Sequence, residues 1–182
     1  MRFFTAFCTL LIICASAQAV DHNSLKPAIS HLRTFANSPD VIKVIKSQTQ
    51  HRTIRELLKI DQLWRIEPGI ENKIFNTDAQ GLLLEFMAKH NAVFVEMIVI
   101  GSQGETLGAI PKTSDYWQGD EAKFKQVMGH GDIFIDAMDW DESSQTISAQ
   151  ISVPVFADNE VIGVITGAVE ASLKALGDVE LR

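Results

Sequence analysis

Residues 146–169 read TISAQISVPVFADNEVIGVITGAV, and this stretch decides the fold. Every second residue from Ile147 to Val155 is apolar, and the residues between them are mostly polar. A period of two is typical of a β-strand whose two faces have different surroundings. Asp158 and Asn159 are turn-forming residues, and the β-branched run that follows them predicts a second strand. The sequence therefore predicts an antiparallel hairpin here.

The second strand of this hairpin, residues 161–169, carries Gly163 and Gly167 four positions apart. Glycines on one face of a strand leave that face thin, which predicts the close approach of a helix or a ligand. Working outward, residues 93–100 are dense in β-branched side chains, and residues 106–110 return after a glycine-bounded turn. These two segments predict a further hairpin.

Between the two hairpins the sequence is less regular. Residues 120–128 have the character of a short helix, and residues 133–137 alternate again as a strand. The segments together predict an antiparallel sheet of about five strands. Periodicity alone leaves the order of the strands open.

Helical periodicity precedes the sheet, over residues 22–90. Apolar residues recur at intervals of three and four from Leu25 to Trp64, which predicts helices with one apolar stripe. Thr77 and Gln80 have the spacing of a capping box at the start of a further helix. We expect an α+β fold in which the long N-terminal helices pack on one face of the sheet, and we place this sheet within residues 93–170.

The first nineteen residues have the features of a secretory signal peptide. Arg2 supplies the positive start, an apolar run extends to Ala15, and Ala17 and Ala19 form a small-x-small cleavage site. A retained membrane anchor is the weaker interpretation, because the apolar run is shorter than the roughly 20 residues that a bilayer requires. Residues 20–182 then form a single domain in the periplasm, and both cysteines are lost with the leader.

Charge and motifs exclude several classes of function. The net charge of −7 disfavours nucleic acid and membrane surfaces as partners. The sequence contains no nucleophile elbow, phosphate-binding loop or His-Glu-x-x-His motif, so we expect no enzyme. The five histidines are scattered along the chain, and we expect neither a metal site nor a cofactor.

Residues 112–121, KTSDYWQGDE, resemble a loop of the extracytoplasmic PAS-like sensor domains of the Cache (PDC) family. The strand segments 94–99, 147–156 and 161–167 agree with the same resemblance. It implies a PAS-like antiparallel sheet curved around a small-molecule cavity, in a free-standing, single-domain form. The loop lacks the arginine with which amino-acid-binding relatives often clamp a carboxylate, so the resemblance does not favour an amino-acid ligand.

A small-molecule pocket requires apolar walls and a few fixed polar groups. The aromatic loop, residues 112–121, and the helix after it offer both kinds of side chain. The expected ligand-binding residues are Asp115, Tyr116, Trp117, Gln118, Asp120, Lys123, Asp136 and Thr166. The acidic residues among them favour a cationic or hydroxylated ligand. The structural alternative is that Tyr116 and Trp117 only cover the sheet, that Asp120 caps a helix, and that Asp136 and Thr166 face solvent.

The expected function is a periplasmic module that binds a small molecule and acts through a separate membrane-bound receptor or enzyme. The N-terminal helical stripe could contact that partner or form a homodimer, although packing on the chain's own sheet explains the same apolar positions. The alternative is a protein-interaction module of an envelope complex that binds no ligand.

Overall fold

The computed structural model describes residues 25–47, 52–136, 139–141 and 146–170. The predicted leader, residues 1–19, lies outside these ranges. The helices within them are α1 (Lys26–Ala36), α2 (Pro39–Ser47), α3 (Ile54–Ile66), α4 (Glu71–Ile74), α5 (Thr77–His90) and α6 (Ala122–His130). The strands are β1 (Glu96–Ile100), β2 (Thr106–Ile110), β3 (Phe134–Ile135), β4 (Asp139–Asp141), β5 (Thr146–Ala157) and β6 (Glu160–Glu170).

The strands form one antiparallel sheet in the order β2-β1-β6-β5-β3, and β4 also pairs with β5. The first and last strands are neighbours at its centre, with Glu96 opposite Ala168 and Ile100 opposite Val164. Two predicted hairpins, β1–β2 and β5–β6, are therefore joined side by side. The prediction of an α+β fold with an antiparallel sheet is confirmed. The strand order depends on which hairpin edges meet, and the sequence carries no periodic signal for that choice.

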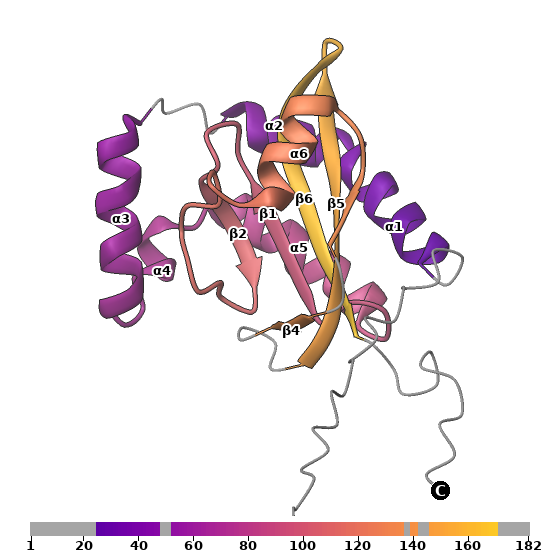
Figure 1. The fold of residues 1–182 in the computed structure, drawn as a ribbon, viewed down its shortest axis with the longest axis horizontal. Helices are drawn as coiled ribbons and strands as arrows, with labels where there is room; N and C mark the ends of the chain where they lie inside the picture. The colour runs from indigo at the N-terminus through magenta and orange to yellow at the C-terminus, as the bar shows by residue number, and fades with distance from the viewer. Residues whose placement is uncertain (1–24, 48–51, 137–138, 142–145, 171–182) are drawn as a thin grey trace, which may run out of the picture.

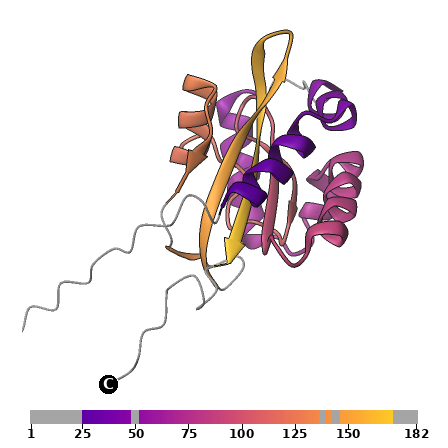
Figure 2. The same ribbon diagram turned by 90° about the vertical axis from the view of Figure 1, so that its right-hand side faces the viewer.

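The helices lie on both sides of the sheet (Figures 1 and 2). Helices α1, α2 and α5 cover one face, and α6 lies on the opposite face against β5 and β6. Helices α3 and α4 lie beside the sheet, beyond its edge strand β2 (Figure 1). The N-terminal helices thus cover one face as predicted, but α3 packs elsewhere.

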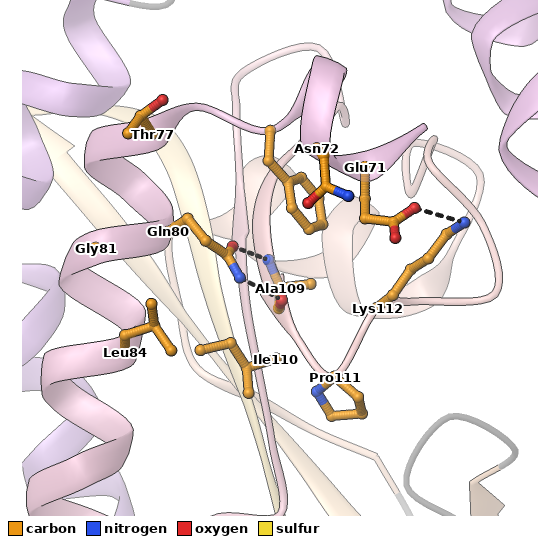
Figure 3. Close-up of a pocket in the computed structure, with 11 residues that line it drawn as sticks. Glu71, Asn72, Thr77, Gln80, Gly81, Leu84, Ala109, Ile110, Pro111 and Lys112 are labelled. Atoms are coloured by element: carbon orange, nitrogen blue, oxygen red, sulfur yellow. Dashed lines mark hydrogen bonds and ion pairs between the residues drawn. The ribbon is translucent and has the colours of Figure 1, made fainter. Parts of the chain in front are cut away.

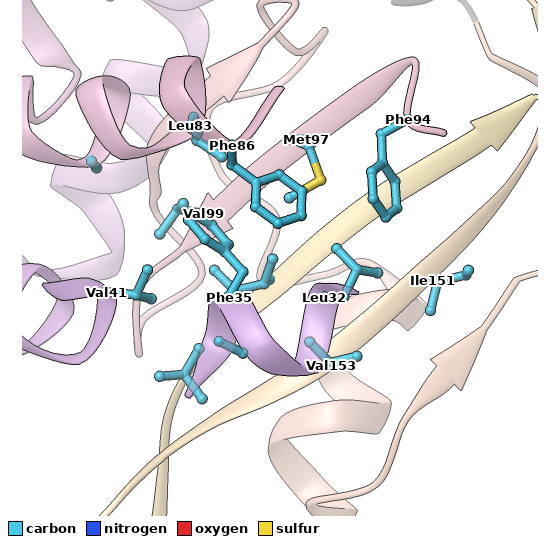
Figure 4. Close-up of a cluster of buried hydrophobic side chains, with 14 of the residues drawn as sticks. Leu32, Phe35, Val41, Leu83, Phe86, Phe94, Met97, Val99, Ile151 and Val153 are labelled. Atoms are coloured by element: carbon cyan, nitrogen blue, oxygen red, sulfur yellow. The ribbon is translucent and has the colours of Figure 1, made fainter. Parts of the chain in front are cut away.

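The main core lies between α1, α5 and the sheet (Figure 4). Leu32 of α1 and Met97 of β1 have no exposed surface. The rings of Phe35 and Phe86 join α1 to α5 with a centroid distance of 4.5 Å. Each such side chain contributes about 1.5–3 kcal/mol when it is buried. The apolar stripe of α1 therefore binds the chain's own sheet.

Two glycines of β6 allow this close packing. A Cβ atom at Gly167 would lie 2.9 Å from Leu32, Phe94 and Met97, and a Cβ atom at Gly163 would lie 3.2 Å from Ile45 of α2. The sequence left open whether a helix or a ligand approaches these glycines. At Gly167 helix α1 does, through Leu32. At Gly163 the nearest atom to an added Cβ would be the backbone carbonyl oxygen of Ile100 on β1, at 2.6 Å, and the side chain of Ile45 on α2 comes second.

One predicted helix start is wrong. Helix α5 is capped by Asn76, whose Oδ1 accepts a hydrogen bond of 2.8 Å from the backbone of Ala79. The predicted capping box of Thr77 and Gln80 does not form, because the amide of Gln80 pairs with both backbone groups of Ala109 on β2, at 3.1 and 3.2 Å. Gln80 thereby pairs the backbone N–H and C=O of Ala109 at the edge of β2, groups that would otherwise be open to another strand.

The packing at Gly167 generates a stability prediction. Gly167→Ala should destabilise the protein by about 1–3 kcal/mol, because the new methyl group overpacks the contact between β6 and α1. Gly81→Ala is the matched control: no atom lies within 4 Å of its added Cβ, so helix propensity should stabilise the protein by about 0.5–1 kcal/mol. Urea unfolding of the two variants measures the difference. Equal effects would show that α1 does not pack closely on β6.

Candidate functional site

The register of the strands identifies the side chains on the face that α6 covers. The rows of cross-strand partners on this face are Glu96–Ala168–Gln150 and Ile98–Thr166–Ser152–Phe134. Partners in one row point to the same side of a sheet. Ile98 belongs to a buried cluster with Phe124 and Val127 of α6, which shows that both rows lie on the same side of the sheet as this helix.

This face carries an unusual number of buried polar side chains. We call Glu96, Ser148, Gln150, Ser152 and Thr166 the polar face; all of them are buried except Gln150, which is half-buried. Ser148 lies two residues from Gln150 on β5 and so points the same way. Glu96 is 2% exposed, and Ser152 and Thr166 have no exposed surface. The α1-side face of the same strands is apolar. Burial of polar groups is unfavourable unless they are paired, so this asymmetry indicates a role other than packing.

The polar face is partly paired within itself. The hydroxyl oxygens of Ser152 and Thr166 are 2.8 Å apart, and Gln150 Nε2 donates to Glu96 Oε2 at 3.3 Å. The buried Oγ of Ser148 has no hydrogen-bond partner. Leaving such a group unpaired costs about 1–3 kcal/mol. Ser148 is therefore the position on this face that packing explains least.

Two predicted site residues come from the segment that covers this face. Lys123 of α6 is buried, and its Nζ lies 2.9 Å from Glu121 Oε2. Gln118 is 1% exposed; its Nε2 donates to the carbonyl of Asp115 at 2.8 Å, while its buried Oε1 has no partner. A second buried oxygen with unused acceptor capacity thus lies in the loop that leads into α6.

The two rings of the aromatic loop contact different parts of the molecule. Tyr116 is 1% exposed, and its ring centroid lies 5.5 Å from that of Trp64 on α3. Arg52 Nη1 donates to the Tyr116 hydroxyl at 2.8 Å, and Trp117 Nε1 donates to the carbonyl of Gln103 at 2.8 Å. Tyr116 therefore joins the aromatic loop to α3, and Trp117 joins it to the β1–β2 turn. Their predicted contact with a ligand stays a prediction.

Asp61 of α3 completes this junction. Its Oδ1 accepts hydrogen bonds from the backbone amides of Tyr116 and Trp117, at 2.8 and 3.0 Å. Its Oδ2 accepts from Arg65 Nη2 at 3.1 Å. One buried carboxylate thus fixes the loop backbone and a neighbouring arginine, and the sequence showed it only as one polar position within the apolar stripe.

The remaining predicted site residues are spread over this region. Asp115 forms an ion pair with Arg65 of α3, and Asp120 is exposed. The backbone of Asp136 donates to the carbonyl of Gln150 at 2.8 Å, which places Asp136 at the margin of the polar face. Thr166 lies at the centre of the polar face and Asp136 at its margin, while Lys123 belongs to the helix that packs on β5 and β6. Gln118 and the ring of Trp117 lie at the β1–β2 turn. Asp115 and Tyr116 face α3.

Sequence reasoning missed four residues of the polar face. They are Glu96, Ser148, Gln150 and Ser152. The alternation of residues 148, 150 and 152 predicted a second strand face, but a buried polar face and a solvated one have the same period. Whether such a face is buried depends on tertiary packing, which periodicity does not show.

A separate groove of about 600 Å³ lies between α4, α5 and the free edge of β2 (Figure 3). Leu84, Ile110 and Pro111 form its apolar side, and Lys112 Nζ lies 3.1 Å from Glu71 Oε2 at its end. Two interactions lower the pKa of the Glu71 carboxyl: first, and larger, a hydrogen bond with its own backbone, and second the ion pair with Lys112. None of the residues predicted for the ligand site lines this groove.

The histidines are less scattered than their spacing suggested. The rings of His31 and His90, from α1 and α5, have centroids 4.2 Å apart. Burial, and then the proximity of His31 and Lys89, lowers the pKa of His90. Among the residues that the structure covers, no group of three or more histidine, cysteine or acidic side chains could hold a metal ion.

Within the described ranges, none of the helices combines the length and apolar character that spanning a bilayer requires.

Tyr116 gives a spectroscopic prediction, because it is the chain's single tyrosine. Burial, the largest effect, raises the pKa of Tyr116 to about 12, above the ordinary value of 10.0. The neutral phenol therefore stabilises the fold below pH 10, and this contribution is lost as the pH rises toward 12. Alkaline titration of tyrosinate absorbance should give a midpoint well above 10. A midpoint near 10 with an intact circular dichroism spectrum would contradict the buried position of the ring.

Removal of the Asp61 carboxylate gives a second prediction. Asp61→Ala should destabilise the protein by about 2–4 kcal/mol, because two loop amides lose their acceptor in a buried position. Asp61→Asn should restore part of the loss, since its amide oxygen still accepts a hydrogen bond. Glu85→Ala, at an exposed ion pair of α5, is the control and should change little. Denaturant unfolding measures the free energy of unfolding of each variant. An Asp61→Ala variant as stable as the control would contradict the role assigned to Asp61.

The comparisons with known proteins concern the fold. No family model matches the chain, and no curated protein matches its sequence. Among solved structures, the sensor domain of DcuS from E. coli superposes with a TM-score of 0.51 and 16% identity, over 86% of this chain and 96% of that domain.

Two chemoreceptor domains superpose more loosely. The ligand-binding domain of Campylobacter jejuni Tlp3, solved with 4-methylisoleucine, gives a TM-score of 0.43 at 15% identity over 84% of this chain. That of Pseudomonas aeruginosa PctC, an amino acid chemoreceptor solved with GABA, gives 0.43 at 10% identity over 82%. The chain spans 61% and 63% of their lengths. The chain therefore shares the PAS-like α+β fold of the DcuS sensor domain, and this is the fold that the resemblance of the aromatic loop implied.

Proposed function

We propose that this protein is an extracytoplasmic sensor module that binds a small molecule between the polar face and the segment carrying α6. The observation that supports this most is the burial of four polar side chains on one face of the sheet, namely Glu96, Ser148, Ser152 and Thr166, of which Ser148 has no hydrogen-bond partner. Ligand sites are hollows with a few fixed polar groups. The fold agrees with this role, since the DcuS domain is described as a sensor domain.

In the proposed site the sheet supplies the floor. The hydroxyls of Ser152 and Thr166 and the amide of Gln150 are held by their neighbours at fixed positions. Lys123 and Gln118 approach from the covering segment, and Asp136 lies at the margin. Tyr116 and Trp117 act indirectly, because they fix the position of the aromatic loop. Tyr116 packs on Trp64 of α3, and Trp117 donates a hydrogen bond to the carbonyl of Gln103. Fixed polar groups favour recognition because little ordering is needed on binding.

The signal peptide interpretation places this module in the periplasm. We propose that it reports through a separate membrane-bound receptor or enzyme. No catalytic role is part of the proposal, since the polar face holds no nucleophile paired with a base.

Binding is tested with a variant that preserves the core. Ser152→Ala combined with Thr166→Val replaces a buried hydroxyl pair by apolar groups of similar shape, an exchange that is close to neutral for stability. A thermal-shift screen with amino acids, amines, dicarboxylates and sugars should yield a compound that stabilises the wild type. Calorimetry should then show about tenfold or greater weakening in the double variant, equivalent to 1.4 kcal/mol or more.

Thr34→Val, on the exposed outer surface of α1, is the matched control and should bind like the wild type. If the double variant bound the compound with wild-type affinity, the site would lie elsewhere. If no compound bound, and native mass spectrometry of the protein isolated from the periplasm gave the bare chain, the sensor proposal would fail.

The second candidate function is an interaction module without a ligand. The packing of Tyr116 against α3 favours it, because that packing fastens a helix whose outer side is apolar. The absence of any bound compound together with a specific protein partner would select this alternative.

A further inference from the structure

Helix α3 carries most of the exposed apolar surface of the described residues. Among all the described residues, the exposed large hydrophobic side chains are Ile54, Leu58, Leu63, Ile66, Leu84 and Phe156. The first four of these belong to α3. Ile66 is 75% exposed. The stripes of α1 and α2, by contrast, are buried against the sheet. Of the N-terminal helices that the sequence offered as a partner surface, α3 alone remains available.

The outward side of α3 is also basic. At about 100° per residue, Arg55 and Lys59 fall between Leu58 and Leu63 on the side opposite the buried Trp64. Both cations are exposed. Glu56 is directed to the helix start, where its carboxylate accepts from the Thr53 backbone at 2.7 Å. The surface is therefore apolar and positive, on a protein whose net charge is −7.

A surface of complementary character lies on another side of the molecule. The groove between α2 and α5 has a volume of about 490 Å³, and its lining includes Asp40, Asp78, Glu85, Lys43, Leu82 and Gly81. Because Glu85 is paired with Lys89 outside this lining, Asp40 and Asp78 supply the negative charge in excess of Lys43. Gly81 also borders the groove beside β2, and nothing lies within 4 Å of a Cβ atom built on it. A notch in α5 therefore separates two hollows.

We propose that α3 of one molecule docks in the α2–α5 groove of a second copy of this chain. Its apolar side chains enter the hollows beside Gly81, and Arg55 and Lys59 lie against the acidic lining. This is the helix-in-groove mode of recognition, with apolar anchors and charges that set the orientation. Figures 1 and 2 show α3 and the α2–α5 side on different parts of the molecule, so one copy cannot satisfy both surfaces by itself.

A contact between two different surfaces has a consequence for assembly. Each molecule keeps one free helix and one free groove, so such contacts form rings or open chains rather than a closed pair. Association therefore increases with concentration. It weakens as salt is added, since exposed charges are screened over about 10 Å at 0.1 M ionic strength.

The test uses two variants that each lose one surface. Leu58→Ser with Lys59→Glu alters only exposed residues of α3, and Gly81→Leu with Glu85→Lys fills the notch and reverses a groove charge. In sedimentation velocity at low salt, the wild type should form species larger than a monomer, and each variant alone should associate about tenfold or more weakly. A mixture of the two keeps one intact helix and one intact groove, and should form a 1:1 dimer that grows no further.

Arg33→Glu, on the outer side of α1, is the charge-matched control and should associate like the wild type. Circular dichroism checks that every variant is folded. A wild type that stays monomeric at all concentrations would overturn the proposal. So would a helix variant that associates normally, a mixture that stays monomeric, or an α3 that binds vesicles of anionic phospholipid while the protein remains a monomer.

Discussion

The pairing of β1 with β6 is the constraint on which the other features depend. These strands come from different hairpins, and their register from Glu96–Ala168 to Ile100–Val164 aligns the two hairpins in one sheet. The same register sets which residues share a face. It brings Glu96 beside Gln150 and Ile98 beside Thr166, and it turns Gly167 toward α1. A shift by one residue would exchange the apolar face and the polar face.

The two faces of the sheet differ in the side chains that they bury. The α1-side face supplies the apolar core, with Leu32 and Met97 at its centre. The opposite face combines a smaller apolar cluster under α6 with buried polar groups, and these polar groups are carried at a cost in stability. We interpret the polar face as a ligand-binding surface whose buried polar groups lower the stability of the fold. Asp61 contributes from outside the sheet, because it holds the loop that leads into the covering helix.

The sequence predicted the layers of the fold better than the site. Periodicity identified both hairpins and the helices, because burial on one side imposes a pattern on the sequence. The capping box at Thr77 failed because Gln80 serves the edge of β2, a tertiary contact that local spacing cannot show. The aromatic loop was identified by its composition, yet Tyr116 turns toward Trp64, and that direction is set by Asp61 some fifty-five residues away. In the sequence, the residues of the polar face resemble those of a solvated strand, because their burial depends on tertiary packing that the local pattern does not show.

The most direct measurement is a high-resolution crystal structure of the protein purified from its native cells. Our account predicts a hollow above Ser152 and Thr166, with a bound molecule or ordered waters within hydrogen-bond distance of Ser148 Oγ. Side chains of α6 that filled this space, with Ser148 Oγ bonded to another protein group, would contradict it. The protein would then be a PAS-like scaffold whose function lies on its outer helices.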